Sequence, residues 1–152
     1  MAEALTLEKL KNSLGKEVAV SDWLAVTQDR INAFADCTDD HQWIHVDPEK
    51  AKDGPFQTTI AHGFLTLSLL SHFHFQVKIF PSDIKMAVNY GLNKVRFLNP
   101  VPAGSRIRAR FKVLEMAPKG GGRILMTLEN TVEVQGQDKP AMIAETLTLL
   151  FV

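Results

Sequence analysis

The sequence lacks an excess of charge of either sign. Its 17 Lys and Arg residues balance 17 Asp and Glu residues, so the formal net charge at pH 7 is zero. A protein without a net positive field has little means of holding a nucleic-acid backbone or an anionic membrane surface. The charge balance therefore predicts neither nucleic acid nor a membrane as a partner.

Cysteine and long apolar runs are also scarce. The single cysteine, Cys37, excludes an internal disulfide framework and fits a reducing cytosol. Glu3 and Glu8 stand where a signal peptide carries positive charge. No apolar run approaches the ~18 residues that a membrane span needs. These features predict a cytoplasmic protein.

The chain of 152 residues has the length of one domain. Its character changes once, near residue 85, where helical patterns and loops give way to strands. That order predicts an α+β fold rather than alternating βαβ units. We expect a single domain over residues 1–152, in which residues 1–16 form an N-terminal helical extension.

Short helices are predicted before residue 85. Residues 6–14 and 27–36 have amphipathic patterns that begin at good N-capping residues. The polar stretch 38–47 is predicted to be a loop, and Pro48 is predicted to open a one-turn helix. Residues 62–75 are apolar on nearly all sides, which predicts a long helix buried in the core.

Strands are predicted for short stretches within residues 18–26 and for most of the chain after residue 88. Residues 106–113 alternate charged and apolar side chains, as a half-buried strand does. Gly91 lies inside a predicted strand and indicates a bulge. The expected architecture is an antiparallel sheet of about five strands wrapped round a long central helix, which is the hotdog arrangement. Because such a sheet has open edges that a second subunit can close, we expect a homodimer.

Acids and imidazoles concentrate in the predicted loop, and Asp40 and His45 are the candidates for chemistry there. In a turn-like loop these two side chains can point at one water molecule. An imidazole with a pKa of about 6.5 both accepts and donates protons near neutral pH, and a carboxylate can orient the water. The alternative is structural: Asp47 caps the Pro48 turn, while Asp40 and His45 satisfy the loop backbone. Spacing alone leaves both interpretations open.

Metal, nucleophile and phosphate sites are not expected. His41 and His45 lie in a predicted loop and have no cysteine to complete a zinc set. His72 and His74 point apart at a helix end, where the helix dipole favours them. Cys37 is predicted to be a buried thiol, and Ser68 lacks the Gly-x-Ser-x-Gly elbow. The Gly120–Gly122 run links two strands, which is not a phosphate-binding arrangement.

Gly63 begins the predicted buried helix. A glycine there leaves its backbone N–H bare, in a position to stabilise an oxygen that gains negative charge. The alternative is a glycine required for close packing, and the residue alone favours that alternative.

The order of these residues resembles a known motif. Asp40-x-x-x-x-His45-x-Asp47-Pro48, followed by Ile60-Ala61-His62-Gly63-Phe64, resembles the hydratase-2 motif of the MaoC-like (R)-specific enoyl-CoA hydratases. The stretches 42–47, 54–56 and 89–97 are similar to the branch with nodulation protein N-like and mycobacterial (3R)-hydroxyacyl-CoA dehydratases. The resemblance covers most of the chain, roughly residues 17–150.

The resemblance implies a hotdog fold, a homodimer and reversible syn hydration of a trans-2-enoyl-CoA thioester to (3R)-3-hydroxyacyl-CoA, with no cofactor. By position, Asp40 and His45 form the acid/base pair, and the Gly63 N–H holds the thioester oxygen. Many relatives have Asn-Pro where this chain has Gln42-Trp43, which leaves the substrate's shape open. The substrate-binding residues that the resemblance implies are Ile60, Ala61, His62, Ser68, Ser71, Asn89, Tyr90 and Gly91.

Three other functions remain open on sequence. A thioesterase on the same fold would release free thiol from acyl-CoA. A non-catalytic acyl-thioester binding protein would bind CoA without turnover. The cationic residues on 106–112 could attract an acidic acyl carrier protein, unless Glu129 and Glu133 on the next strand pair with them.

Overall fold

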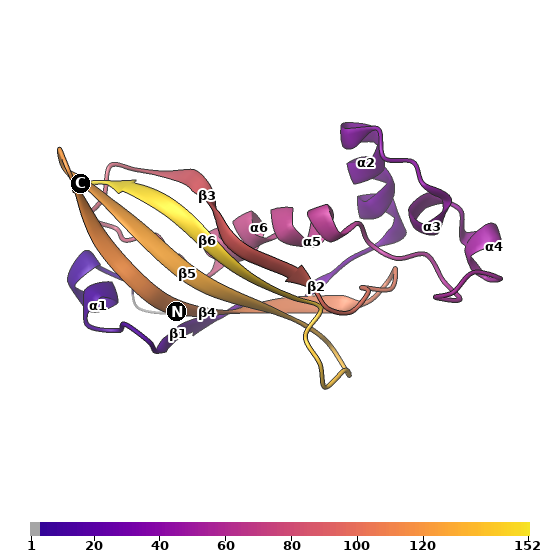
Figure 1. Ribbon diagram of the computed structural model, residues 1–152. Helices are drawn as coiled ribbons and strands as arrows, with labels where there is room; N and C mark the ends of the chain where they lie inside the picture. The colour runs from indigo at the N-terminus through magenta and orange to yellow at the C-terminus, as the bar shows by residue number, and fades with distance from the viewer. Residues whose placement is uncertain (1–3) are drawn as a thin grey trace.

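The computed structural model describes residues 4–152, so residues 1–3 of the predicted N-terminal extension lie outside it (Figure 1). The fold is α+β, as predicted, and its antiparallel sheet has the strand order β1-β4-β5-β6-β3. A short strand, β2, also pairs with β4, so the sheet has six strands where about five were expected. The strands are β1 (Glu17–Val20), β2 (Leu24–Ala25), β3 (Met86–Phe97), β4 (Arg106–Gly120), β5 (Arg123–Val134) and β6 (Met142–Phe151).

Strand β4 shows why the chain forms this sheet. Its alternating apolar side chains, including Ile107 and Phe111, are fully buried, whereas the arginines between them remain partly exposed. Successive side chains of a strand point to opposite faces, so a period of two places one set in the core. The predicted half-buried strand is confirmed.

Strand β3 forms one edge of the sheet, with β6 as its partner. The pairing register shifts between Asn89 and Gly91, which confirms the predicted bulge.

Helices α5 (Gly63–Ser68) and α6 (Leu70–Gln76) lie along one face of the sheet (Figure 1). Leu65 and Phe73 face the core, but Phe64 and Phe75 are 70% and 72% exposed. The prediction of one long helix buried on all sides is therefore wrong in two respects, since the helix is divided at Leu69 and its outer side is bare. Nothing in the described chain covers that outer side.

Helices α2 (Gln28–Thr38), α3 (Trp43–Val46) and α4 (Pro48–Ala51) form a lobe beyond the end of the sheet (Figure 1). The Thr27 hydroxyl and the Asp47 carboxylate accept hydrogen bonds from backbone N–H groups, which confirms the predicted starts of α2 and α4. Helix α3 replaces part of the predicted loop. It has no side-chain cap, so tertiary contacts rather than local sequence stabilise it.

Helix α1 (Leu7–Lys11) is shorter than the predicted helix and packs on the sheet's core through Leu7 and Leu10. Across residues 4–152, no helix combines the length and apolar character that crossing a membrane requires.

Truncation of a core side chain should test this packing. Phe111 is fully buried between the sheet and the helices, so Phe111→Ala should lower the free energy of unfolding by about 3–5 kcal/mol, as measured by urea denaturation. The exposed Leu14 gives a matched control, because Leu14→Ala should change stability by less than about 0.5 kcal/mol. Equal effects of the two substitutions would contradict the placement of Phe111.

Candidate active site

Asp40, His45 and Gly63, predicted from separate parts of the sequence, line one pocket of about 420 Å³. The pocket lies where the helical lobe meets the start of α5. Its other lining residues are Phe34, Thr38, His62, Phe64 and Phe97.

His45 is buried on α3, and its protonation pattern follows from its partners. Its Nδ1 lies 2.7 Å from the Ile60 carbonyl oxygen, which can only accept a hydrogen bond. Nδ1 therefore carries the proton, and in the neutral ring Nε2 has a free lone pair. An imidazole in this tautomer can take a proton from a bound water.

The backbone around His45 is held by a network that the sequence did not indicate. Gln28 Nε2 donates to the His45 carbonyl oxygen at 2.7 Å, and the Thr59 hydroxyl donates to Gln28 Oε1 at 2.5 Å. The Ile60 N–H donates to the Ile44 carbonyl oxygen at 3.0 Å. Since these partners lie on different elements, sequence periodicity carried no signal for them.

Asp40 follows the end of α2, where Asp39 adopts a left-handed conformation with φ of 60° and turns the chain. The Asp40 carboxylate is half exposed and accepts one long hydrogen bond, 3.4 Å, from the Gln42 N–H. Its backbone carbonyl accepts a hydrogen bond from His62 Nε2 at 3.0 Å. The carboxylate is thus open to the pocket while its main chain is anchored.

His62 connects the two candidate catalytic residues. Its ring stacks on the His45 ring with centroids 3.8 Å apart and an angle of 23° between the planes. Because Nε2 donates to Asp40, the Nδ1 lone pair remains, and this buried atom has no hydrogen-bond partner among residues 4–152. The predicted role of His62 in substrate binding stays a prediction.

The Gly63 N–H starts α5 and makes no hydrogen bond to any described residue. A Cβ at this position would lie 3.1 Å from the Phe97 ring, so the glycine also permits close packing. The close-packing interpretation is therefore confirmed, and the role of the Gly63 N–H in holding an oxygen stays a prediction. With six residues, α5 contributes less dipole than the predicted long helix would.

Asp40, His45 and His62 offer ligand atoms within 4.8 Å of one another, which raises the question of a metal. A zinc ion would need both imidazoles to direct a lone pair to one point about 2.0–2.1 Å away. Rings that stack nearly parallel direct their lone pairs side by side, so one ring would have to turn. The donor set fits a water-binding site better than a metal site.

One prediction about another side chain is wrong. Cys37 is exposed on α2 rather than buried, because it lies on the outer side of the helix. His74 lies in the last turn of α6, as predicted, but it is buried there, and burial lowers its pKa, although the hydrogen bond to Asn130 acts in the opposite direction. His41 pairs with Asp36 at 2.8 Å and not with His45.

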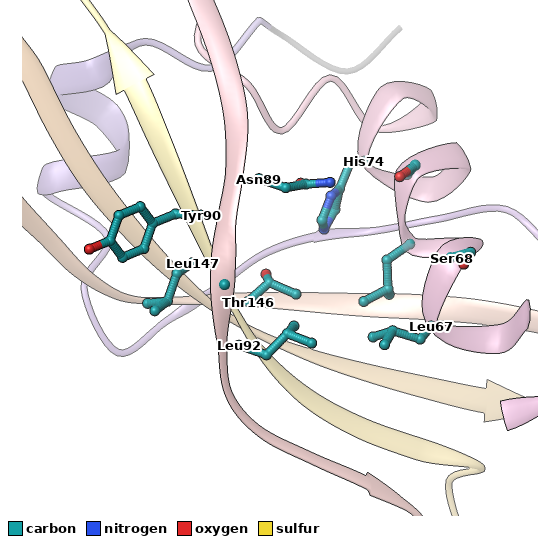
Figure 2. A pocket seen from close by; sticks show the side chains of 11 residues that line it. Leu67, Ser68, His74, Asn89, Tyr90, Leu92, Thr146 and Leu147 are labelled. Carbon is teal, nitrogen blue, oxygen red and sulfur yellow. The ribbon is translucent and has the colours of Figure 1, made fainter. Parts of the chain in front are cut away.

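The remaining predicted substrate-binding residues line two further pockets. Ser68, Ser71, Asn89, Tyr90 and Gly91 line a pocket of about 410 Å³ between α5, α6, β3 and β6. Figure 2 shows Asn89 directed toward the helices, whereas the Tyr90 ring lies on the other side of β3. Ile60 and Ala61 line a third pocket, of about 250 Å³, that also touches Gly63.

The predicted role of Ser68 and Ser71 in substrate binding stays a prediction. The Ser68 hydroxyl donates to the Phe64 carbonyl oxygen at 2.7 Å. Within the described chain, neither Ser68 nor Ser71 makes a hydrogen bond to Asp40 or His45.

Trp43, where this chain departs from many relatives, points away from the acid/base pair. Its ring packs on Gly54, where a Cβ would lie only 2.9 Å from it, and the Lys50 ammonium lies 4.9 Å from the ring centroid. Trp43 does not line the pocket that contains Asp40. Its bulk therefore fills the helical lobe rather than that pocket.

The sheet, the helices on one of its faces and the pocket at the start of α5 define a hotdog-fold protein with a candidate acid/base site. The family model described as MaoC like domain matches residues 9–136, and the chain belongs to that family.

Three known proteins illustrate the similarity. The 3-hydroxyacyl-thioester dehydratase Z of Mycobacterium tuberculosis is 51% identical over 138 residues, which cover 91% of each chain. Nodulation protein N of Rhizobium leguminosarum is 44% identical over 147 residues, 96% of this chain and 91% of that protein. The R-hydratase PhaJ1 of Pseudomonas aeruginosa superposes with a TM-score of 0.72 at 25% identity, over 91% of this chain and 81% of that chain.

The pH dependence of stability should report the buried His74. A lowered pKa in the folded state means that the unfolded chain binds the proton more readily, so stability falls as the pH drops below about 6.5. His74→Gln should flatten the fall in unfolding free energy between pH 7.5 and pH 5.5, by up to about 1.4 kcal/mol per pH unit. His72→Gln, at an exposed neighbouring position, should leave the slope unchanged. An unchanged slope in His74→Gln would mean that His74 is protonated as easily folded as unfolded.

Proposed function

We propose that this protein is an enzyme that reversibly hydrates trans-2-enoyl-CoA to (3R)-3-hydroxyacyl-CoA. The observation that carries the proposal is the meeting of Asp40, His45 Nε2 and the unbonded Gly63 N–H in one pocket. The names of similar proteins, a 3-hydroxyacyl-thioester dehydratase and an R-hydratase, support the same class of reaction.

In the proposed mechanism, the thioester oxygen accepts a hydrogen bond from the Gly63 N–H, which draws electron density away from C3. Asp40 and His45 hold one water over C3, and the Asp40 carboxylate accepts a hydrogen bond from the O–H that stays on the water oxygen. His45 Nε2 takes the other proton as the water oxygen bonds to C3, and the electron pair of the C2–C3 double bond moves toward the thioester oxygen. The protonated His45 then delivers its proton to C2 on the same face, which completes a syn addition.

The acyl chain has a route along α5. Gly63 starts this helix, and Leu67 and Ser68 line the 410 Å³ pocket about one turn, or ~6 Å, farther along the axis. We place the acyl chain in that pocket, with residues 89–91 of β3 on its far wall. No cofactor takes part in this scheme.

The ion pairs on β4 weaken the alternative in which an acidic acyl carrier protein brings the substrate. The Nε atoms of Arg108 and Arg110 each lie 2.7 Å from a Glu133 carboxylate oxygen, and Lys112 lies 3.3 Å from Glu129. Paired charges present little free positive field to an acidic carrier protein. A CoA thioester is therefore the proposed substrate, and a thioesterase or a non-catalytic binding protein remain the functions to be separated by assay.

Hydration of crotonyl-CoA should depend on the acid/base pair. Asp40→Asn and His45→Ala should each lower kcat/KM by about 10²–10⁴-fold, because each removes a proton-transfer or water-orienting group. The assay follows the loss of enoyl-thioester absorbance, and chiral analysis of the product should give the 3R enantiomer.

The matched controls are neighbours with the same chemistry outside the pocket. Asp39→Asn, in a left-handed position that asparagine tolerates, and His41→Ala should retain activity. Release of free thiol by the unmodified protein would instead indicate a thioesterase. Full activity in Asp40→Asn and His45→Ala would refute the assignment.

We also propose a homodimer formed through β3. This edge strand exposes Val88, Tyr90 and Leu92, and the outer faces of α5 and α6 expose Phe64 and Phe75. An exposed apolar edge strand is a template for pairing with another chain. A two-fold pairing of β3 with its copy would bury these side chains and extend the sheet. The free thiol of Cys37 fits the reducing cytosol in which we place this dimer.

A charge on this edge should disrupt the dimer. Val88→Lys together with Tyr90→Lys should shift the mass measured by light scattering from two chains to one, because two like charges would face their copies across the two-fold axis. Leu14→Lys, at a similarly exposed apolar position outside this edge, should leave the mass unchanged. A monomeric unmodified protein would rule the interface out.

A further inference from the structure

Asn130, in the middle of β5, is a fully buried amide beside a mainly apolar core. Its Nδ2 donates to the carbonyl oxygens of Leu128 and Ala144, at 3.1 and 2.9 Å, and to the Thr146 hydroxyl at 3.0 Å. Carbonyl oxygens only accept, so these contacts fix the orientation of the amide. Oδ1 must then face His74, whose Nε2 lies 2.9 Å away.

This network fixes the state of the His74 ring. Because Oδ1 of Asn130 is an acceptor, His74 Nε2 must carry the proton. Burial lowers the pKa of His74, against the effect of the Asn130 hydrogen bond, so the ring is neutral near pH 7. Its Nδ1 is then a bare acceptor, and it makes no hydrogen bond to any residue of 4–152.

Both ends of the network reach the pocket of about 410 Å³ that the proposed function gives to the acyl chain. His74 and Thr146 line this pocket among leucines, and Figure 2 shows them on its walls together with Asn89. Thr146 uses its oxygen to accept from Asn130, which leaves its own O–H as a donor. The leucines on the wall are Leu67, Leu70, Leu92 and Leu147.

The bare acceptor of His74 and the free donor of Thr146 together have a specific complement, in a pocket that Ser68, Ser71, Asn89 and Tyr90 also line. A purely alkyl chain would remove both groups from water without replacing their hydrogen bonds, which is unfavourable. A carboxylate would find no Lys or Arg among the residues that line the pocket. A hydroxyl group can donate to His74 Nδ1 and accept from the Thr146 O–H.

We propose that this pocket is a subsite for acyl chains that carry a hydroxyl group beyond the reacting carbons, with His74 and Thr146 as the recognising residues. The proposal rests on the function proposed above, because it takes the acyl chain of a CoA thioester as the occupant. It adds the chemical class of that chain, which an apolar pocket alone would not specify.

Binding of saturated thioesters tests the proposal without any turnover. Isothermal titration calorimetry would compare octanoyl-CoA with its 6-, 7- and 8-hydroxy derivatives, whose hydroxyls lie too far from the thioester to close a five- or six-membered lactone, and with suberoyl-CoA, whose chain ends in a carboxylate. At least one hydroxylated chain should bind about 5-fold or more tightly than octanoyl-CoA, as one net hydrogen bond provides, and suberoyl-CoA should bind more weakly than that chain. Equal binding of octanoyl-CoA and all three hydroxylated chains would overturn the proposal.

Two variants assign the preference to the named residues. His74→Leu, and independently the near-isosteric Thr146→Val, should each reduce the preference for the hydroxylated chain, whereas His72→Leu on the exposed side of α6 should retain it. A preference that persists in both pocket variants would refute the subsite. If a variant fails to fold, the ratio of the unmodified protein's affinities for the hydroxylated and the unsubstituted chain decides the case. A protein that does not hydrate crotonyl-CoA would refute the proposed function. The activity assay and the binding ratio are independent measurements, so the two proposals can fail separately.

Discussion

The stacking of His45 on His62 is the contact on which the candidate active site depends. His45 belongs to α3 in the helical lobe, and His62 immediately precedes α5, which packs on the sheet. His62 also binds the Asp40 carbonyl, and the Ile60 carbonyl fixes the tautomer of His45. The His62 ring thus contacts both candidate catalytic residues, and it links the lobe to the helix that packs on the sheet.

In this arrangement, the elements that form the core differ from those that carry the candidate catalytic pair. The sheet and the inner sides of α5 and α6 form the core, while the short helices of the lobe depend on contacts such as the one from Gln28 to the His45 backbone. Side chains that are themselves held rigidly need little reorganisation when charge develops on a substrate. The half-exposed Asp40 carboxylate is the least constrained member, which suits its proposed contact with a water molecule.

Local patterns predicted local structure well. Alternation in β4, the caps at Thr27 and Asp47, and the bulge at Gly91 all depend on residues within a few positions, and each is confirmed. The division of the helix at Leu69 and the exposure of Cys37 were missed. An apolar helix face predicts burial, but whether something covers that face depends on elements elsewhere in the chain.

At the site, Asp40, His45 and Gly63 could be predicted as candidates from the amino-acid order, because their spacing resembles a known motif. The stacking of His62 on His45 and the neutral state of His74 beside Asn130 could not, and they became known from the folded chain. These contacts join residues that are far apart in the chain. Periodicity reports which side of its own element a residue occupies, whereas protonation state and partner depend on what the folded chain brings to that side.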